Sequence, residues 1–96
     1  MTRRGQWRIE LLPAARRELL ALRNPIRARV RDAIRGLAHD PFPQDSIAMR
    51  DKGVGLHRLR VGSYRVVYRL QAERVCVLVI RIGHRSEVYR GWEGHR

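Results

Sequence analysis

The chain has 96 residues, enough for one domain with a single modest core, and its 44% hydrophobic content argues against disorder. No apolar run approaches the length of a membrane span, and the first four residues lead into no signal-like apolar stretch. Cys76 is the only cysteine, which excludes an internal disulfide. We therefore expect one cytoplasmic domain over residues 1–96 that does not associate with membranes.

Charge is the most informative property of the composition. Twenty-one basic residues stand against nine acidic ones, which gives a formal net charge of +12 at pH 7. Lys52 is the only lysine. A GC-rich genome accounts for arginine in place of lysine, but it does not account for the scarcity of acids. Because such a domain repels itself, we expect a polyanion or an acidic protein as its partner.

The first third of the chain predicts a strand followed by two helices. Residues 7–11 alternate apolar and polar side chains, which is typical of a short strand. Pro13 suits a first helical position, and residues 14–22 are good helix formers. Asn24 as N-cap, with Pro25 at the first helical position, predicts the start of a second helix. The apolar residues of this helix form one stripe at helical spacing: Ile26, Val30, Ala33, Ile34 and Leu37.

Three arginines stand on the outer face of this second helix. Arg27, Arg31 and Arg35 follow one another at intervals of four residues, and each like-charged pair costs about 0.2–0.5 kcal/mol. The pattern fits a phosphate or an acidic protein facing the helix. It fits a merely solvated face equally well, because the energies are small.

The second half of the chain predicts strands only. Residues 56–61 and 64–71 flank Gly62-Ser63, a two-residue turn that suits a type II′ hairpin with glycine first. This register places Leu59 opposite Val66 on an apolar face and Arg60 opposite Arg65 on the other face. Residues 75–82 form an aliphatic run that suits a buried strand. We therefore expect an α+β fold of order β-α-α-β-β-β, an antiparallel sheet with both helices packed on one face and the other face open.

The expected open face carries residue types that phosphodiester cleavage needs. Arg58, Arg60 and Arg65 lie side by side on it, and guanidinium groups bind phosphate oxygens and offset the charge that builds on phosphorus. A further group must take a proton from the nucleophile, and another must supply one to the leaving oxygen. The sequence holds no carboxylate or His/Cys cluster with ligand spacing, so we expect no metal and no cofactor. Without a metal, the most accessible nucleophile is the 2′-hydroxyl of RNA.

Two segments resemble a known family. The segment LRVGSYRVVY at residues 59–68 and the segment GHRSEVY at residues 83–89 are similar to the RelE branch of the RelE/ParE toxin superfamily. The resemblance implies a toxin of a type II toxin-antitoxin system that cleaves mRNA, commonly on the ribosome, by 2′-hydroxyl attack that leaves a cyclic phosphate and a 5′-hydroxyl. It also implies an acidic antitoxin as partner, and operator DNA contacted only through the toxin–antitoxin complex.

The resemblance also implies roles for individual residues. Arg65 matches the arginine that stabilises the transition-state phosphate, Arg85 the group that assists the leaving group, and Tyr89 the tyrosine that orients the scissile nucleotide or shares proton transfer. Arg58 stands where the family often has a lysine. Because arginine is a poor proton acceptor, Arg58 is expected to act as a phosphate clamp, and His84 or Tyr89 as general base. The remaining residues expected to contact RNA are Arg50, Lys52, Arg60, Arg69 and Arg81.

Two other functions fit the same sequence. One is a ParE-like poison of DNA gyrase that does not cut nucleic acid. The absence of the lysines that RelE-like toxins often carry, as at Arg58, leaves room for this function. The other is a non-toxic module that binds an antitoxin and, through it, operator DNA.

Overall fold

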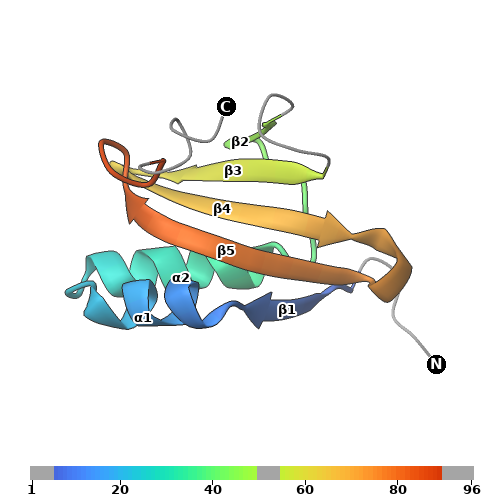
Figure 1. Cartoon of the computed structure of the whole chain (residues 1–96), viewed down its shortest axis with the longest axis horizontal. Coiled ribbons are helices and arrows are strands. Elements are labelled where there is room, and N and C mark those ends of the chain that lie inside the picture. Colours follow the sequence, from blue (N-terminus) through green and yellow to red (C-terminus); the bar gives the residue numbers. More distant parts are fainter. Residues whose placement is uncertain (1–5, 50–54, 90–96) are drawn as a thin grey trace.

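The computed structural model describes residues 6–49 and 55–89. Within these residues a five-stranded sheet has the strand order β1-β5-β4-β3-β2, and the two long helices pack against one of its faces (Figure 1). The elements are β1 (Arg8–Leu11), α1 (Pro13–Ala21), α2 (Ile26–Gly36), β2 (Ser46–Ala48), β3 (Leu56–Val61), β4 (Tyr64–Gln71), a short 3-10 helix (Ala72–Arg74) and β5 (Cys76–His84). The expected α+β class, with both helices on one face, is confirmed.

The sheet differs from the expected one in two respects. It is mixed rather than antiparallel, because β1 pairs with β5 in parallel while the other neighbours are antiparallel. It also contains an additional strand, β2, which pairs with β3 at the sheet edge. Local sequence patterns carry no information on the direction of a partner more than sixty residues away, and three residues are too few to show alternation.

The central hairpin has the predicted register. Arg60 pairs with Arg65 and Leu59 with Val66, and Gly62 has a φ of +60° in the turn, a conformation that glycine adopts without steric cost. The register between β4 and β5 shifts once, so that Ile80 on β5 has no partner on β4. This β-bulge changes which side chains of β5 share a face.

The two helices begin differently. Pro13 is the first residue of α1, as predicted. The predicted cap of α2 is wrong: the helix begins at Ile26, Pro25 occupies the cap position, and the Asn24 side chain makes no capping hydrogen bond. The Asn24–Pro25 peptide bond is cis. At this helix start the Arg27 N–H donates to the Arg23 carbonyl at 3.0 Å and the Arg29 N–H to the Pro25 carbonyl at 3.1 Å, so backbone carbonyls satisfy N–H groups of the first turn.

The main core lies between the helices and the sheet. Ala15 of α1 and Val30, Ile34 and Leu37 on and just after α2 pack against buried residues of three strands, namely Leu59, Val66, Tyr68, Val77, Val79 and Ile82. No helix within residues 6–49 and 55–89 is long and apolar enough to cross a membrane.

The second sheet face is only partly open, which corrects the expectation. A smaller core covers part of it, formed by Met49, Leu56, Val67 and Val88, with Ile80 and Tyr89 beside them. The chain after β5 turns back over the sheet. Val88 packs directly over Gly83, where a Cβ would lie in van der Waals contact, 3.4 Å from the Val88 Cβ. The return of the chain places Tyr89 next to the arginines of β3.

Candidate RNA-binding site

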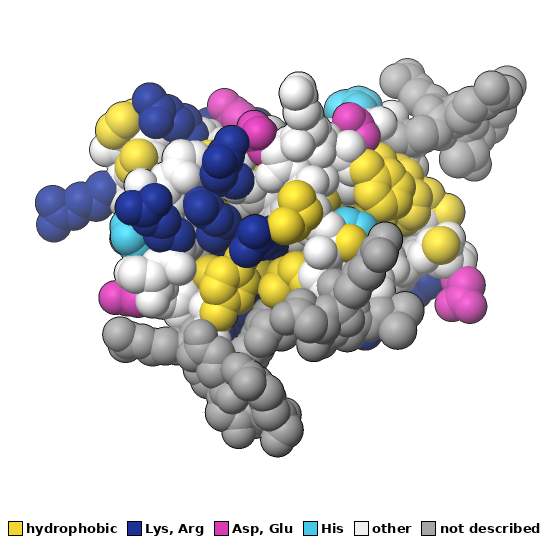
Figure 2. All heavy atoms as spheres, turned by 90° about the horizontal axis from the view of Figure 1, so that it is seen from above, with side chains coloured by type: hydrophobic (Ala, Val, Ile, Leu, Met, Phe, Trp, Pro, Cys, Tyr) yellow, Lys and Arg dark blue, Asp and Glu magenta, His cyan; other side chains and the backbone are white. Residues whose placement is uncertain are grey.

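Three arginines line one cavity at the end of the sheet. Arg58 and Arg60 of β3 and Arg65 of β4 bound a space of about 260 Å³, which Gln44, Asp45 and Ile47 close from the side of β2. We call this space the arginine cavity. Figure 2 shows basic side chains gathered in one region of this view of the molecule. Arg58, Arg60 and Arg65 thus border one space, as their places in the hairpin register lead one to expect.

The arginines of the cavity are held in different ways. Arg65 donates from one nitrogen to the Gly62 and Tyr64 carbonyl oxygens, at 3.0 Å each, which fixes its guanidinium against the hairpin turn. Arg60 lies 3.5 Å from the Asp45 carboxylate, and both side chains are more than half exposed, so this pair is weak. One carboxylate thus faces three guanidinium groups, and the cavity has an excess of positive charge.

A hydrogen bond from Arg58 connects Tyr89 to the arginine cavity. The Arg58 guanidinium donates to the Tyr89 hydroxyl oxygen at 3.4 Å, and the tyrosine ring packs beside the smaller core. Since the hydroxyl oxygen accepts from Arg58, its own proton is directed away from Arg58. The sequence prediction that Tyr89 and the arginines act at one site is consistent with this geometry.

His84 lies on the other side of the hairpin. It pairs with Tyr64, their ring centroids are 5.5 Å apart in edge-to-face geometry, and neither residue lines the arginine cavity. The Ser86 backbone N–H donates to His84 Nδ1 at 3.2 Å, and the Ser86 hydroxyl lies 2.8 Å from the same atom. Because a backbone N–H can only donate, Nδ1 is the acceptor, and the ring proton of the neutral histidine is on Nε2. In this arrangement Nε2 is a hydrogen-bond donor rather than a base.

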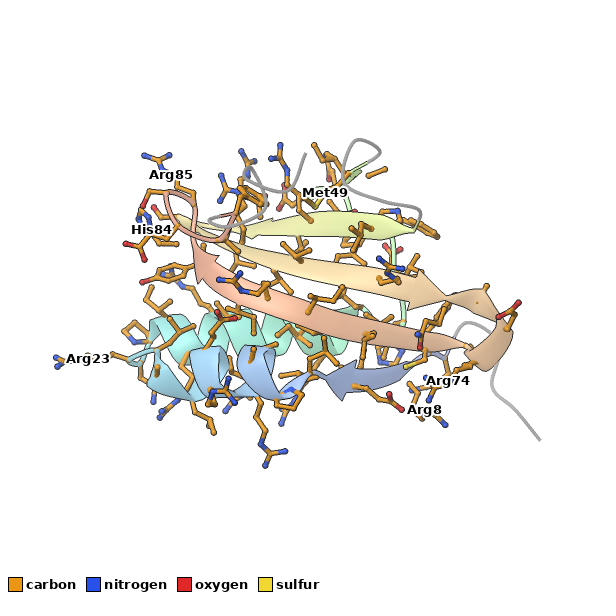
Figure 3. All side chains as sticks on the ribbon, viewed as in Figure 1. Arg8, Arg23, Met49, Arg74, His84 and Arg85 are labelled. Atoms are coloured by element: carbon orange, nitrogen blue, oxygen red, sulfur yellow. The ribbon has the colours of Figure 1, made fainter. Side chains whose placement is uncertain are left out.

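Arg85 lies in the turn that follows β5. Its backbone N–H donates to the Ser63 carbonyl at 2.8 Å, which pins the turn after β5 to the hairpin turn. The side chain is exposed and points away from the sheet in Figure 3. It does not line the arginine cavity.

Of the other described residues predicted to contact RNA, Arg60 lines the cavity, whereas Arg69 and Arg81 do not. Arg81 pairs with Glu18 of α1 at 3.1 Å, and the second Glu18 oxygen accepts from the Ile82 N–H at 2.8 Å. Glu18 thus occupies the edge of β5 beyond the end of β1. Arg69 is exposed and pairs in register with Leu56, at the other end of the hairpin. Arg50 and Lys52 lie outside the described residues.

The sequence did not predict the side of the arginine cavity that lies near β2. Gln44 and Asp45 come from the segment that leads into β2, and Ile47 comes from β2 itself. The Asp45 carbonyl accepts from the Arg60 N–H at 3.0 Å. The only available signal was Asp45 itself, an acid in an arginine-rich chain. Within the described part of the chain, no three His, Cys, Asp or Glu side chains are grouped to hold a metal ion.

Comparison with known proteins shows which family this chain resembles. Residues 9–89 match the family model described as the ParE toxin of the type II toxin-antitoxin system parDE. Toxin RelG of Mycobacterium tuberculosis is 31% identical over 83 residues, which cover 85% of this chain and 94% of RelG. The fold and site therefore define a toxin-like α+β domain with a basic sheet face.

Two solved structures have a fold similar to that of this chain. The toxin–antitoxin complex RelBE2 of M. tuberculosis matches with 29% identity and a TM-score of 0.72, covering 82% of this chain and 98% of that chain. The archaeal RelE–RelB complex of Pyrococcus horikoshii matches with 23% identity and a TM-score of 0.74, covering 85% and 98%, and shares the fold. This chain belongs to the RelE/ParE family of toxins from type II toxin-antitoxin systems.

Proposed function

We propose that this toxin is an endoribonuclease that cleaves mRNA, on the ribosome, without a metal ion. The observation that carries the proposal is the arginine cavity, in which Arg58 and Arg65 face one space while Tyr89 bonds to Arg58. Its similarity to RelG and to RelBE2 supports the same branch of the family.

The proposed reaction is attack of the 2′-hydroxyl on the adjacent phosphorus. A bond forms between O2′ and phosphorus while the bond from phosphorus to O5′ breaks, which leaves a cyclic phosphate and a 5′-hydroxyl. Arg58 and Arg65 bind the phosphate oxygens and offset the charge that grows in the transition state. The Tyr89 oxygen accepts the proton of the 2′-hydroxyl while its own phenol proton passes to solvent, and the leaving O5′ takes up a proton from solvent. Arg85, which points away from the sheet in Figure 3, would stabilise the leaving O5′ once its side chain turns toward the bound RNA.

Between the two candidate bases, the geometry favours Tyr89. The Tyr89 hydroxyl is bonded to a cavity arginine, whereas His84 faces away from the cavity and its Nδ1 is occupied by Ser86. We therefore assign proton transfer to Tyr89 rather than to His84.

We also propose an acidic antitoxin as partner, with operator DNA contacted only through the complex. RelBE2 of M. tuberculosis is a toxin–antitoxin complex, and the P. horikoshii structure is a complex of RelE with RelB. A chain of net charge +12 has the complementary charge for an acidic protein segment. Co-expression with the acidic product of an adjacent gene should yield a complex and abolish growth arrest.

The family model favours a second candidate function. Its description is that of a ParE toxin, and the corresponding activity would be poisoning of DNA gyrase without cleavage of RNA. Expression followed by transcript mapping separates the two: codon-phased cuts with 5′-hydroxyl ends favour the nuclease, and DNA damage with intact mRNA favours the gyrase poison.

Arg65→Ala gives the direct test of the nuclease. Single-turnover cleavage on programmed ribosomes should slow by about 100-fold, because one group that binds the transition-state phosphate is lost. Arg23→Ala removes the same charge from the exposed loop between the helices, which points outward in Figure 3, and should cleave like the wild type. A wild-type rate for Arg65→Ala would exclude this assignment.

A further inference from the structure

A second cavity lies on the helix side of the hairpin turn. Its volume is about 440 Å³, and its walls come from the start of α2 and the ends of β3, β4 and β5. The residues that matter here are Ile26, Arg29, Gly62, Ser63, Tyr64 and His84. We call it the hairpin groove. The residues assigned to the proposed reaction lie outside it.

The hairpin groove and the arginine cavity are linked by a third cavity that borders both. This third cavity, beside α2, shares Arg60 and Asp45 with the arginine cavity and shares Val61 and Gly62 with the hairpin groove. Arg65 spans the junction, since its guanidinium bonds to the Gly62 carbonyl, and Gly62 itself lines the groove. The Gly62-Ser63 turn, in which both residues are exposed, lies between the arginine cavity and the hairpin groove.

The groove has the groups that a nucleotide needs. Tyr64 and His84 present two rings at 85° to one another, so a planar base can lie against one ring and meet the edge of the other. Because His84 Nδ1 accepts from the Ser86 N–H, the ring proton of the neutral histidine is on Nε2. Nε2 can therefore donate to a carbonyl oxygen or a ring nitrogen of a base. Arg29 is exposed on α2 at the groove wall and supplies a cation for the phosphate.

We propose that the hairpin groove binds a nucleotide next to the scissile phosphate, on an RNA strand that bends around the Gly62-Ser63 turn. This proposal rests on the proposed nuclease function, since it extends the same RNA from the arginine cavity. It gives His84 a role in binding and base selection. The linking cavity, positive charge on both sides of the turn and the paired rings all support a nucleotide as the occupant.

Binding of uncleavable RNA tests the groove without relying on cleavage. Fluorescence anisotropy would compare a single-stranded RNA trinucleotide with a longer RNA of the same composition, both carrying 2′-O-methyl sugars, which cannot supply the attacking hydroxyl. The wild type should bind the longer probe more tightly, and His84→Ala should weaken that binding by about tenfold while leaving the trinucleotide unchanged. His84→Gln keeps a donor at this position and should recover part of the affinity.

Two further variants make the test specific. Arg29→Ala should also weaken binding of the longer probe only, whereas Arg23→Ala, with the same loss of charge outside the groove, should bind both probes like the wild type. At subsaturating RNA, cleavage by His84→Ala should slow in proportion to its weaker binding. A slower saturated rate with unchanged binding would make His84 catalytic and overturn the proposal, as would equal losses on both probes or no loss on either.

The outcomes for the groove and for the nuclease are distinguishable. If the wild type binds RNA in this length-dependent, His84-dependent way but cleaves none, the groove stands and the nuclease function falls. If it cleaves RNA while His84→Ala binds both probes normally, the nuclease stands and the groove falls. Failure of the wild type to bind either probe would overturn the groove, whereas the nuclease is judged separately by cleavage on programmed ribosomes.

Discussion

Arg58 on β3 donates a 3.4 Å hydrogen bond to the hydroxyl oxygen of Tyr89, 31 residues further along the chain. The contact exists because the chain after β5 turns back over the sheet and buries Val88 against it. A small core thus positions a proton-transfer group beside a phosphate-binding cation.

Tyr89→Phe should separate the hydroxyl from the ring. The phenylalanine ring keeps the packing beside the smaller core, so the melting temperature should stay close to that of the wild type. Cleavage on programmed ribosomes should slow by about 100-fold or more, because a general acid–base group is lost. An unchanged rate would remove Tyr89 from the mechanism.

Val88→Ala tests whether the smaller core positions Tyr89. Val88 is fully buried, and its truncation should cost about 1–3 kcal/mol of unfolding free energy and also reduce cleavage. Val30→Ala is the matched control, since Val30 is equally buried but in the main core between helices and sheet. It should lose similar stability in denaturant titrations and keep its cleavage rate at a temperature where both variants are folded. Equal activity losses would indicate a general stability effect.

Glu18 should be a structural residue of β5. Glu18→Ala leaves the Ile82 N–H without its acceptor and Arg81 without its partner, and should lower the unfolding free energy by about 1–3 kcal/mol. Glu18→Gln keeps an acceptor for Ile82 and should lose less than about 1 kcal/mol, because the ion pair is partly exposed. Thermal unfolding of the two variants would measure the difference. Equal losses would assign the effect to the charge.

Tyr68 should make stability fall at alkaline pH. Burial raises the pKa of Tyr68, the nearby Asp40 carboxylate adds to the effect, and the hydroxyl donates to the Pro41 carbonyl at 2.8 Å. A raised pKa means that the unfolded chain ionises first, so this contribution is complete below about pH 10 and declines as the pH rises through the folded-state pKa.

Tyr68→Phe provides the comparison. At neutral pH the variant should be less stable by about 1 kcal/mol, because the hydrogen bond to Pro41 is lost. Above about pH 10 the gap between the two proteins should narrow in denaturant titrations. A gap that stays constant with pH would show that Tyr68 ionises alike in both states.

Much of the hairpin and its arginines follows from the sequence. The Gly62-Ser63 turn and the alternation on either side determine the register, and the register places Arg60 opposite Arg65. These are local effects, since two residues of turn chemistry fix which side chains share a face. The net charge likewise predicted an anionic partner without any structure.

Only the tertiary structure decided which residues accompany those arginines. The bulge at Ile80 and the return of the chain at Gly83 place Tyr89 beside Arg58 and leave His84 on the opposite side of the turn. The parallel pairing of β1 with β5, and the contact of Glu18 with β5, join residues more than sixty positions apart. Such contacts depend on how whole elements pack, and no local periodicity records them.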